Sequence, residues 1–159
     1  MFNPDTALAS TYMPSFETAA RSLKVVPITA SVHSDVDIET AIIALGREPG
    51  GGLVVMPDLF LTAHLAPLIL AAARKNVPTV YSRSDFTRDG GLLSYGADRR
   101  DSFLRSATYV DRILRGEKPG DLPVQFPTKF EMAVNRKTAK ALGLAIPPSI
   151  MLRADEVIE

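Results

Sequence analysis

Short apolar runs alternate with helix-forming segments through most of this chain, and this alternation limits the possible folds more than any other feature. The runs at 53–57 (LVVMP) and 77–82 (VPTVYS) are typical of strands that are buried on both faces. Apolar residues at helical spacing predict helices at 37–48 and 63–76. Strands that alternate with such helices indicate βαβ units. The sequence therefore predicts an α/β fold, in which a parallel sheet carries helices on both faces.

The remaining segments extend this pattern toward both ends of the chain. A helix is predicted from Pro14 to Leu23, and a strand at 24–31 (KVVPITAS), which Pro27 restricts to a sheet edge or a bulge. Further on, the sequence predicts a polar loop at 83–91, a short strand at 92–96, a helix at 101–115, a linker at 117–123, a strand at 128–134, a short helix that Asn135 caps and Gly143 ends, and a proline-interrupted, non-helical tail at 146–159.

Composition excludes several classes of function. Eighteen basic residues balance eighteen acidic ones, which argues against a nucleic-acid partner. The chain has no cysteine, so it has no disulfide, thiol nucleophile or thiolate metal site. No apolar run is long enough to cross a membrane, and no export signal precedes the first helix, so the chain as written is expected in the cytoplasm.

The candidate binding residues follow the predicted strands. In an open parallel sheet, ligands bind in the crevice at the carboxyl ends of the strands, and Asn3, Asp58, Ser82 and Tyr95 stand at such positions. Asn3 and Asp58 could instead cap the helices that follow them, and Tyr95 could be ordinary packing. These positions include no nucleophile–base pair, and the sequence lacks phosphate-binding loops. We therefore expect neither an enzyme nor a cofactor or metal site.

The C-terminal part of the sequence is the most specific. It closely resembles the end of a family of bacterial ABC-transporter substrate-binding proteins, which are related to the tryptophan/tyrosine-binding lipoproteins and have the type I periplasmic-binding fold. The matching stretches are 2–7 (FNPDTA), 51–58 (GGLVVMPD), 90–98 (GGLLSYGAD), 109–116 (YVDRILRG) and 127–159.

This resemblance implies that residues 1–159 form one α/β domain, similar to the second lobe of a two-lobe protein. It implies that the segment 91–116 would cross to a first lobe, and that the chain is a truncated form lacking that lobe and the export signal. A small, possibly amino-acid-like solute would bind in the cleft between lobes and be delivered to an ABC permease, in the periplasm. In amino-acid-binding relatives an Asn-Ser pair holds the ligand, whereas Leu8 and Ala9 occupy the matching positions here.

An alternative is a stand-alone α/β protein that self-associates and no longer takes part in transport. The predicted helix 101–115 carries an apolar stripe of Phe103, Ala107, Val110 and Leu114. The helix can fold back onto its own lobe or find another chain, because the linker at 117–123 is long enough for either. Since large apolar patches are rare on soluble monomers, we expect a homodimer with this helix at its interface.

Overall fold

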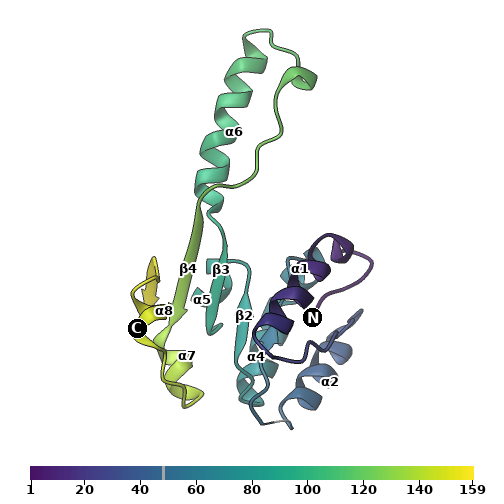
Figure 1. Cartoon of the computed structure of the whole chain (residues 1–159), viewed down its shortest axis with the longest axis vertical. Helices are drawn as coiled ribbons and strands as arrows, with labels where there is room; N and C mark the ends of the chain where they lie inside the picture. Colours follow the sequence, from purple (N-terminus) through teal and green to yellow (C-terminus); the bar gives the residue numbers. More distant parts are fainter. Residues whose placement is uncertain (48) are drawn as a thin grey trace.

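The computed structural model describes residues 1–47 and 49–159. A five-stranded sheet with the order β1-β2-β3-β4-β5 runs through this part of the chain (Figure 1). Its strands are β1 (Leu53–Val54), β2 (Thr79–Tyr81), β3 (Leu93–Ala97), β4 (Phe130–Asn135) and β5 (Glu156–Ile158). All neighbouring strands are parallel except β3 and β4. The predicted α/β class is therefore confirmed, with a mostly parallel sheet.

Helices lie on both sides of this sheet. In Figure 1, α1 lies nearer to the viewer than the sheet, whereas α4 and α5 lie behind it. None of the described helices is both long and apolar enough to cross a membrane. The helices are α1 (Ala9–Ser22), α2 (Asp35–Leu45), α3 (Leu59–Ala63), α4 (Leu65–Arg74), α5 (Ser84–Arg88), α6 (Arg99–Leu114), α7 (Arg136–Ala141) and α8 (Pro148–Met151), with a 3₁₀ turn, η1, at Pro119–Asp121.

The main hydrophobic core lies between β1, β2 and the helices α2 and α4. Ile38 and Ile42 of α2 and Leu68 of α4 are completely buried there, beside Leu53 and Tyr81 of the sheet. The spacing of Ile38 and Ile42 places both on one face of α2, as the sequence pattern predicts. Ser34 begins that helix, and its hydroxyl accepts a hydrogen bond from the Asp37 amide at 3.2 Å.

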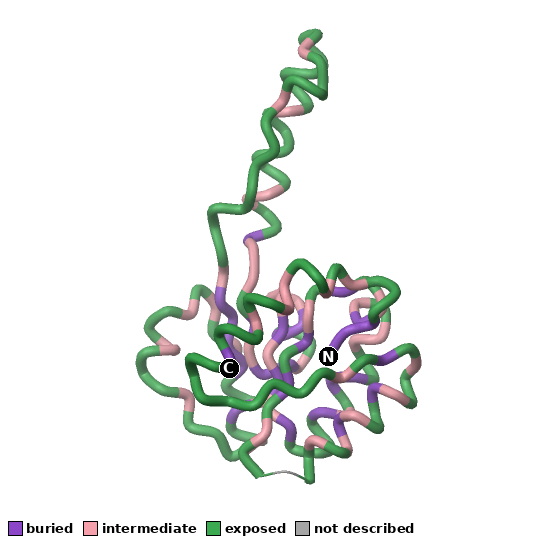
Figure 2. Tube along the Cα trace, turned by 45° about the vertical axis from the view of Figure 1, so that its right-hand side comes forward, coloured by how far each residue is buried: buried purple, intermediate pink, exposed green. Residues whose placement is uncertain are grey.

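An arm built from α6 and the returning segment 115–129 projects from the body of the molecule (Figures 1 and 2). The chain leaves at the carboxyl end of β3, runs along α6 and returns to the same end, so β4 must run antiparallel to β3. The Tyr109 hydroxyl donates a hydrogen bond to the Pro123 carbonyl and ties the helix to the returning segment. No residue of α6, all of which are described, is buried, so the stripe at Phe103 and Val110 does not point into this chain's own core.

The N-terminal predictions need three corrections. Residues 24–31 do not form a regular strand. Within the described part of this segment the single strand-like bridge joins Ser31 to Phe2, and Pro27 has no amide hydrogen to donate to a ladder. Helix α1 begins at Ala9 rather than Pro14, which lies inside it. Helix α2 ends at Leu45, and Glu48, the last residue of the predicted helix, lies outside the described residues.

Four short elements were missed by sequence reasoning. Helix α3 occupies the stretch between the predicted strand at 53–57 and the predicted helix at 63–76, α5 lies in the predicted polar loop, and β5 adds a strand at the sheet edge. The predicted non-helical tail contains α8, which starts at Pro148. Proline is tolerated there because the first residue of a helix needs no amide partner.

Candidate functional site

The carboxyl ends of β1, β2 and β3 meet at one edge of the sheet, because these three strands are parallel. Asp58 follows β1, Ser82 follows β2, and Tyr95 is the middle residue of β3. Asn3 reaches the same edge because Met1 lies beside β1, with its carbonyl accepting a hydrogen bond from the Met56 amide at 3.1 Å. The structure thus brings the sequence-predicted positions to a common edge.

Asn3 and Asp58 are in direct contact and are both almost completely buried. One carboxylate oxygen of Asp58 accepts a hydrogen bond from the Asn3 amide at 2.5 Å. The other accepts from the Thr6 hydroxyl at 2.6 Å and from the Phe60 amide at 2.8 Å. The Asn3 side-chain oxygen accepts from the Asp5 amide at 2.8 Å. Both residues therefore organise local backbone, as the capping interpretation predicts for Asp58 at the start of α3.

Ser82 and Tyr95 lie on neighbouring strands. The register pairs Tyr81 with Ser94, so the residues that follow them are adjacent across the sheet. Gly96 approaches the Ser82 backbone so closely that an added Cβ would lie 1.9 Å from the Ser82 carbonyl oxygen. Ser82 is half-buried, whereas the Tyr95 side chain is 51% exposed. These positions offer a hydroxyl and an accessible aromatic face.

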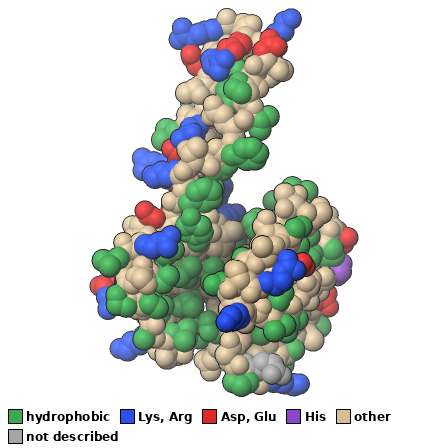
Figure 3. Space-filling model, in the orientation of Figure 1, with side chains coloured by type: hydrophobic (Ala, Val, Ile, Leu, Met, Phe, Trp, Pro, Cys, Tyr) green, Lys and Arg blue, Asp and Glu red, His purple; other side chains and the backbone are tan. Residues whose placement is uncertain are grey.

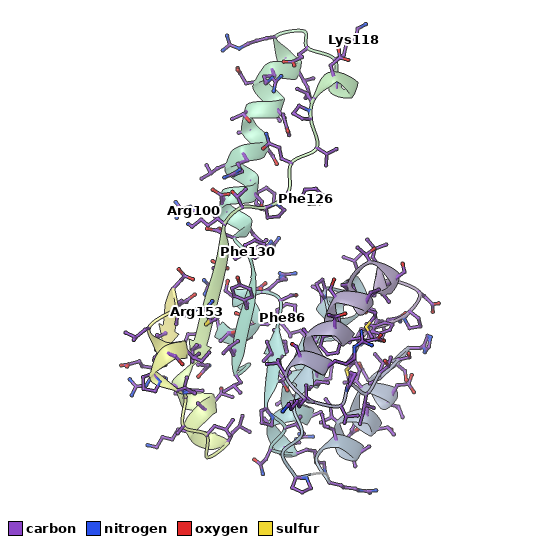
Figure 4. The ribbon with its side chains drawn as sticks, in the orientation of Figure 1. Phe86, Arg100, Lys118, Phe126, Phe130 and Arg153 are labelled. Carbon is purple, nitrogen blue, oxygen red and sulfur yellow. The ribbon has the colours of Figure 1, made fainter. Side chains whose placement is uncertain are left out.

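Phe130 completes an aromatic pair that the sequence did not reveal. Its ring stacks on Tyr95 with the centroids 5.8 Å apart and the planes 19° from parallel. Phe130 begins β4 at the base of the arm, as Figure 4 shows. Because β4 is antiparallel to β3, its first residue lies at the same edge as the carboxyl end of β3. To predict this pair, one would need to know that β4 is antiparallel to β3, and the local sequence does not reveal that pairing.

Two more residues near Asp58 were not predicted. Thr6 donates its hydroxyl to the carboxylate, and Tyr12 places a buried hydroxyl that has no hydrogen-bond partner among the described residues. Burial, together with the negative charge of Asp58, raises the pKa of Tyr12. Tyr12 therefore stays protonated and able to donate a hydrogen bond in the neutral pH range.

Comparison with known proteins identifies the family. The family model described as "ABC transporter substrate binding protein" matches residues 1–158. The chain belongs to this ABC transporter substrate-binding protein family. No curated protein matches the sequence.

Solved structures share the fold of this family member. A conserved domain protein from Vibrio cholerae has a TM-score of 0.86 at 24% identity, covering 98% of this chain and 52% of that one. An ABC domain from Streptococcus pneumoniae in complex with L-Trp has a TM-score of 0.86 at 22% identity, covering 99% and 53%. A ligand-free, open substrate-binding protein with adhesive properties from Clostridium difficile has a TM-score of 0.69 at 18% identity, covering 99% and 52%. The substrate-binding chain described here thus spans about half the length of these structures.

The first turn of α1 departs from the pattern that the resemblance implies. Leu8 precedes the helix, and its side chain makes no capping hydrogen bond. Leu8 is exposed and Ala9 is half-buried. Both side chains are apolar, whereas the resemblance implies an Asn-Ser pair at these two positions.

Each of the two histidines lies beside a different aspartate. The His64 Nδ1 atom lies 2.5 Å from a carboxylate oxygen of Asp35, so this contact links the α3–α4 junction to the start of α2. The His33 Nε2 atom lies 3.5 Å from a carboxylate oxygen of Asp5. Within residues 1–47 and 49–159, no three potential metal-ligating side chains are grouped. The edge itself presents hydrogen-bonding and aromatic groups, which suit the capture of a solute.

We predict that Asp58→Ala lowers the free energy of unfolding by about 2–3 kcal/mol, because it removes the acceptor of three hydrogen bonds. Urea unfolding followed by circular dichroism measures the change. Ser34→Ala is the matched control, since Ser34 also begins a helix but accepts a single bond, and it should cost about 1 kcal/mol. Equal losses of unfolding free energy in the two variants would contradict the role of Asp58 in linking Asn3 and Thr6 to the start of α3.

Proposed function

We propose that this chain is the solute-binding lobe of an ABC-type uptake system, with the ligand held at the sheet edge formed by Asn3, Asp58, Ser82 and Tyr95. The observation that carries the proposal is the convergence of these side chains at the carboxyl ends of parallel strands. The family match over residues 1–158 supports it. The ligand would lie in a cleft between this lobe and a first lobe, and closure would follow by hinge bending.

The roles of the edge residues follow from their exposure. Asn3 and Asp58 are largely occupied by local backbone, so their part is to fix the shape of the edge. Tyr95 and Phe130 present aromatic faces to the ligand, and Ser82 offers a hydroxyl. The relative from Streptococcus pneumoniae holds L-Trp, which supports a small, amino-acid-like ligand here. Because Leu8 and Ala9 are apolar, the contacts to its polar groups would differ.

The arm has a place in the same proposal. Residues 1–159 would act as one domain, from which the segment 91–116 carries α6 toward a first lobe. Two chain crossings connect the arm to the body, and an ion pair joins them at its base, where the Lys129 ammonium lies 2.8 Å from the Asp98 carboxylate. The hydrogen bond from Lys129 holds the pKa of Asp98 below its usual value. A hinge held by a few such contacts suits a binding protein that opens and closes.

The proposal involves no covalent chemistry. The bound solute would be released to a membrane permease, outside the cytoplasm as is typical of the family. A lobe that binds without a closing partner gives only half of the contacts of a closed cleft. We therefore expect the 159-residue chain alone to bind amino acids only weakly, with a dissociation constant of about 1 mM or higher, equivalent to about −4 kcal/mol at best.

An amide-resolved NMR titration tests this function. Amino acids added to about 10 mM should shift the amides of residues 3, 58, 82 and 95, and Tyr95→Ala should weaken binding about tenfold, equivalent to about 1.4 kcal/mol. Tyr95→Phe is the matched control because it keeps the ring, and it should bind as the wild type does. Shifts that cluster elsewhere, or a Tyr95→Ala variant with unchanged affinity, would refute the proposed site.

A further inference from the structure

A cavity of about 260 Å³ lies at the edge of the sheet opposite to the proposed binding edge. Its floor includes Val77 and Thr79 at the entry to β2 and Leu92 just before β3. Both strands run from this end toward the end from which the arm projects (Figure 1). A first lobe reached through the arm would therefore leave this cavity open. We call it the α4–α7 cavity, after the two helices that form its walls.

The walls of the α4–α7 cavity are mostly apolar. Ile69, Ala72 and Ala73 of α4 form one side, and the other side is formed at the end of α7 by Ala141 and Leu142. Sites for small molecules are typically concave and apolar in this way, with a few polar groups that orient the ligand. The volume equals that of about nine water molecules, at about 30 Å³ each, so it suits a ligand of about ten non-hydrogen atoms.

The polar side chains inside the cavity are neutral, and two of them already have partners. The Thr138 hydroxyl donates a hydrogen bond to the Gly90 carbonyl at 2.9 Å, and the Thr79 hydroxyl donates to the Val77 carbonyl at 3.0 Å. Burial raises the pKa of Tyr81, which also lines the cavity, so this side chain carries no charge in the neutral pH range. The inner part of a ligand must therefore be apolar, because a buried charge would find no charged partner there.

The mouth of the cavity carries a positive charge. Lys137 lines it from the first turn of α7 and is exposed, and its aliphatic stem can lie along an apolar wall while the ammonium stays in water. None of the described lining residues is acidic, and no carboxylate within residues 1–47 and 49–159 forms an ion pair with Lys137. Figure 3 shows Lys and Arg side chains beside hydrophobic ones at the end of the body opposite the arm. The cavity thus combines an apolar interior with a cation at its mouth.

We propose that the α4–α7 cavity binds a small amphipathic carboxylic acid with an apolar body of about eight carbon atoms. The body would lie between α4 and α7, and the carboxylate would accept hydrogen bonds from the Lys137 ammonium. An α-amino acid fits this cavity poorly, because its own ammonium would lie near Lys137 with no carboxylate among the described lining residues to pair with it. The ligand therefore differs in charge from the amino-acid-like solute proposed for the sheet edge, and this proposal does not rest on that function.

An amide-resolved NMR titration with sodium octanoate tests the site. Octanoate should shift the amides of residues 73, 92 and 141 but not those of residues 3, 58 and 95, and the shifts should saturate below about 10 mM. Octanamide has the same chain and a neutral head, so it should bind about three- to fivefold more weakly because it forms no ion pair with Lys137. Shifts that do not saturate, or that cluster outside the cavity, would overturn the proposal.

Two pairs of variants separate binding in the cavity from nonspecific binding. Lys137→Gln should weaken octanoate binding about three- to fivefold and leave octanamide binding unchanged. Lys140→Gln is its matched control, because Lys140 is an exposed lysine of α7 that does not line the cavity, and it should bind octanoate as the wild type does. Ala141→Phe should weaken both probes at least about tenfold by filling the mouth, whereas the same change at the exposed Ala107 of α6 should have no effect. Equal octanoate affinities within either pair would overturn the proposal. Amino acids at the sheet edge would shift other amides, so the two proposals fail separately.

Discussion

Leu68→Ala is expected to lower the free energy of unfolding by about 3–5 kcal/mol, which is the upper part of the range for such truncations. Leu68 is completely buried where α4 packs on α2 and the sheet. Removal of three carbon atoms loses the burial of the side chain and leaves a cavity that rigid neighbours cannot fill. Because single domains are stable by only about 5–15 kcal/mol, the variant should lose a large share of the total stability.

The matched control for this variant is on the same helix. Leu70→Ala makes the same chemical change two residues away, at a side chain that is 54% exposed. It should cost less than about 1 kcal/mol, since most of the leucine already contacts water. Urea unfolding monitored by circular dichroism gives both values. Similar losses in the two variants would mean that α4 does not cover the core with the face assigned here.

Gly96→Ala is expected to destabilise the protein by about 3 kcal/mol and to disturb the proposed binding edge. The added methyl group would lie 1.9 Å from the Ser82 carbonyl oxygen and 2.9 Å from its carbonyl carbon. Both atoms belong to the backbone, so relief requires β3 to move away from β2. Such a shift would carry Tyr95 out of its stack with Phe130.

Gly120→Ala provides the control, because an added Cβ there meets no atom within 4 Å. It should leave the stability within about 0.5 kcal/mol of the wild type. Thermal unfolding compares the two variants, and amide NMR shifts of residues 82 and 95 report the strand movement. A Gly96→Ala variant as stable as the Gly120→Ala variant would show that the two strands are not packed this closely.

Elements with several turns or a clear apolar run were predictable. The α2 and α4 helices and the β2 strand follow from apolar spacing alone, because burial of one face fixes their position. The cap at Asn135 and the end at Gly143 were also correct, with the Asn135 side-chain oxygen accepting from the Thr138 amide at 3.0 Å. These signals depend only on neighbouring residues, so they can be interpreted without knowledge of the rest of the fold.

Short elements were not predictable in the same way. Helices α3 and α5 have five residues each, too few to show a period, and burial of Leu61 and Phe86 in the core holds them in place. Residues 24–31 have the composition of a strand, but a strand forms only where neighbouring backbone pairs with it. In the described structure only Ser31 pairs in this segment, so a strong local preference was not realised.

For the proposed binding edge, the sequence by itself predicted Asn3, Asp58, Ser82 and Tyr95, because a strand end can be recognised from the apolar run before it. Only the tertiary structure decided what surrounds them. It brought Thr6 onto Asp58 and Phe130 onto Tyr95, although these pairs are separated by 52 and by more than 30 positions. It also reversed β4, because an arm that leaves and returns at one end of the sheet requires it. Local pattern fixes which residues form an element, whereas contacts between distant segments depend on the whole path of the chain.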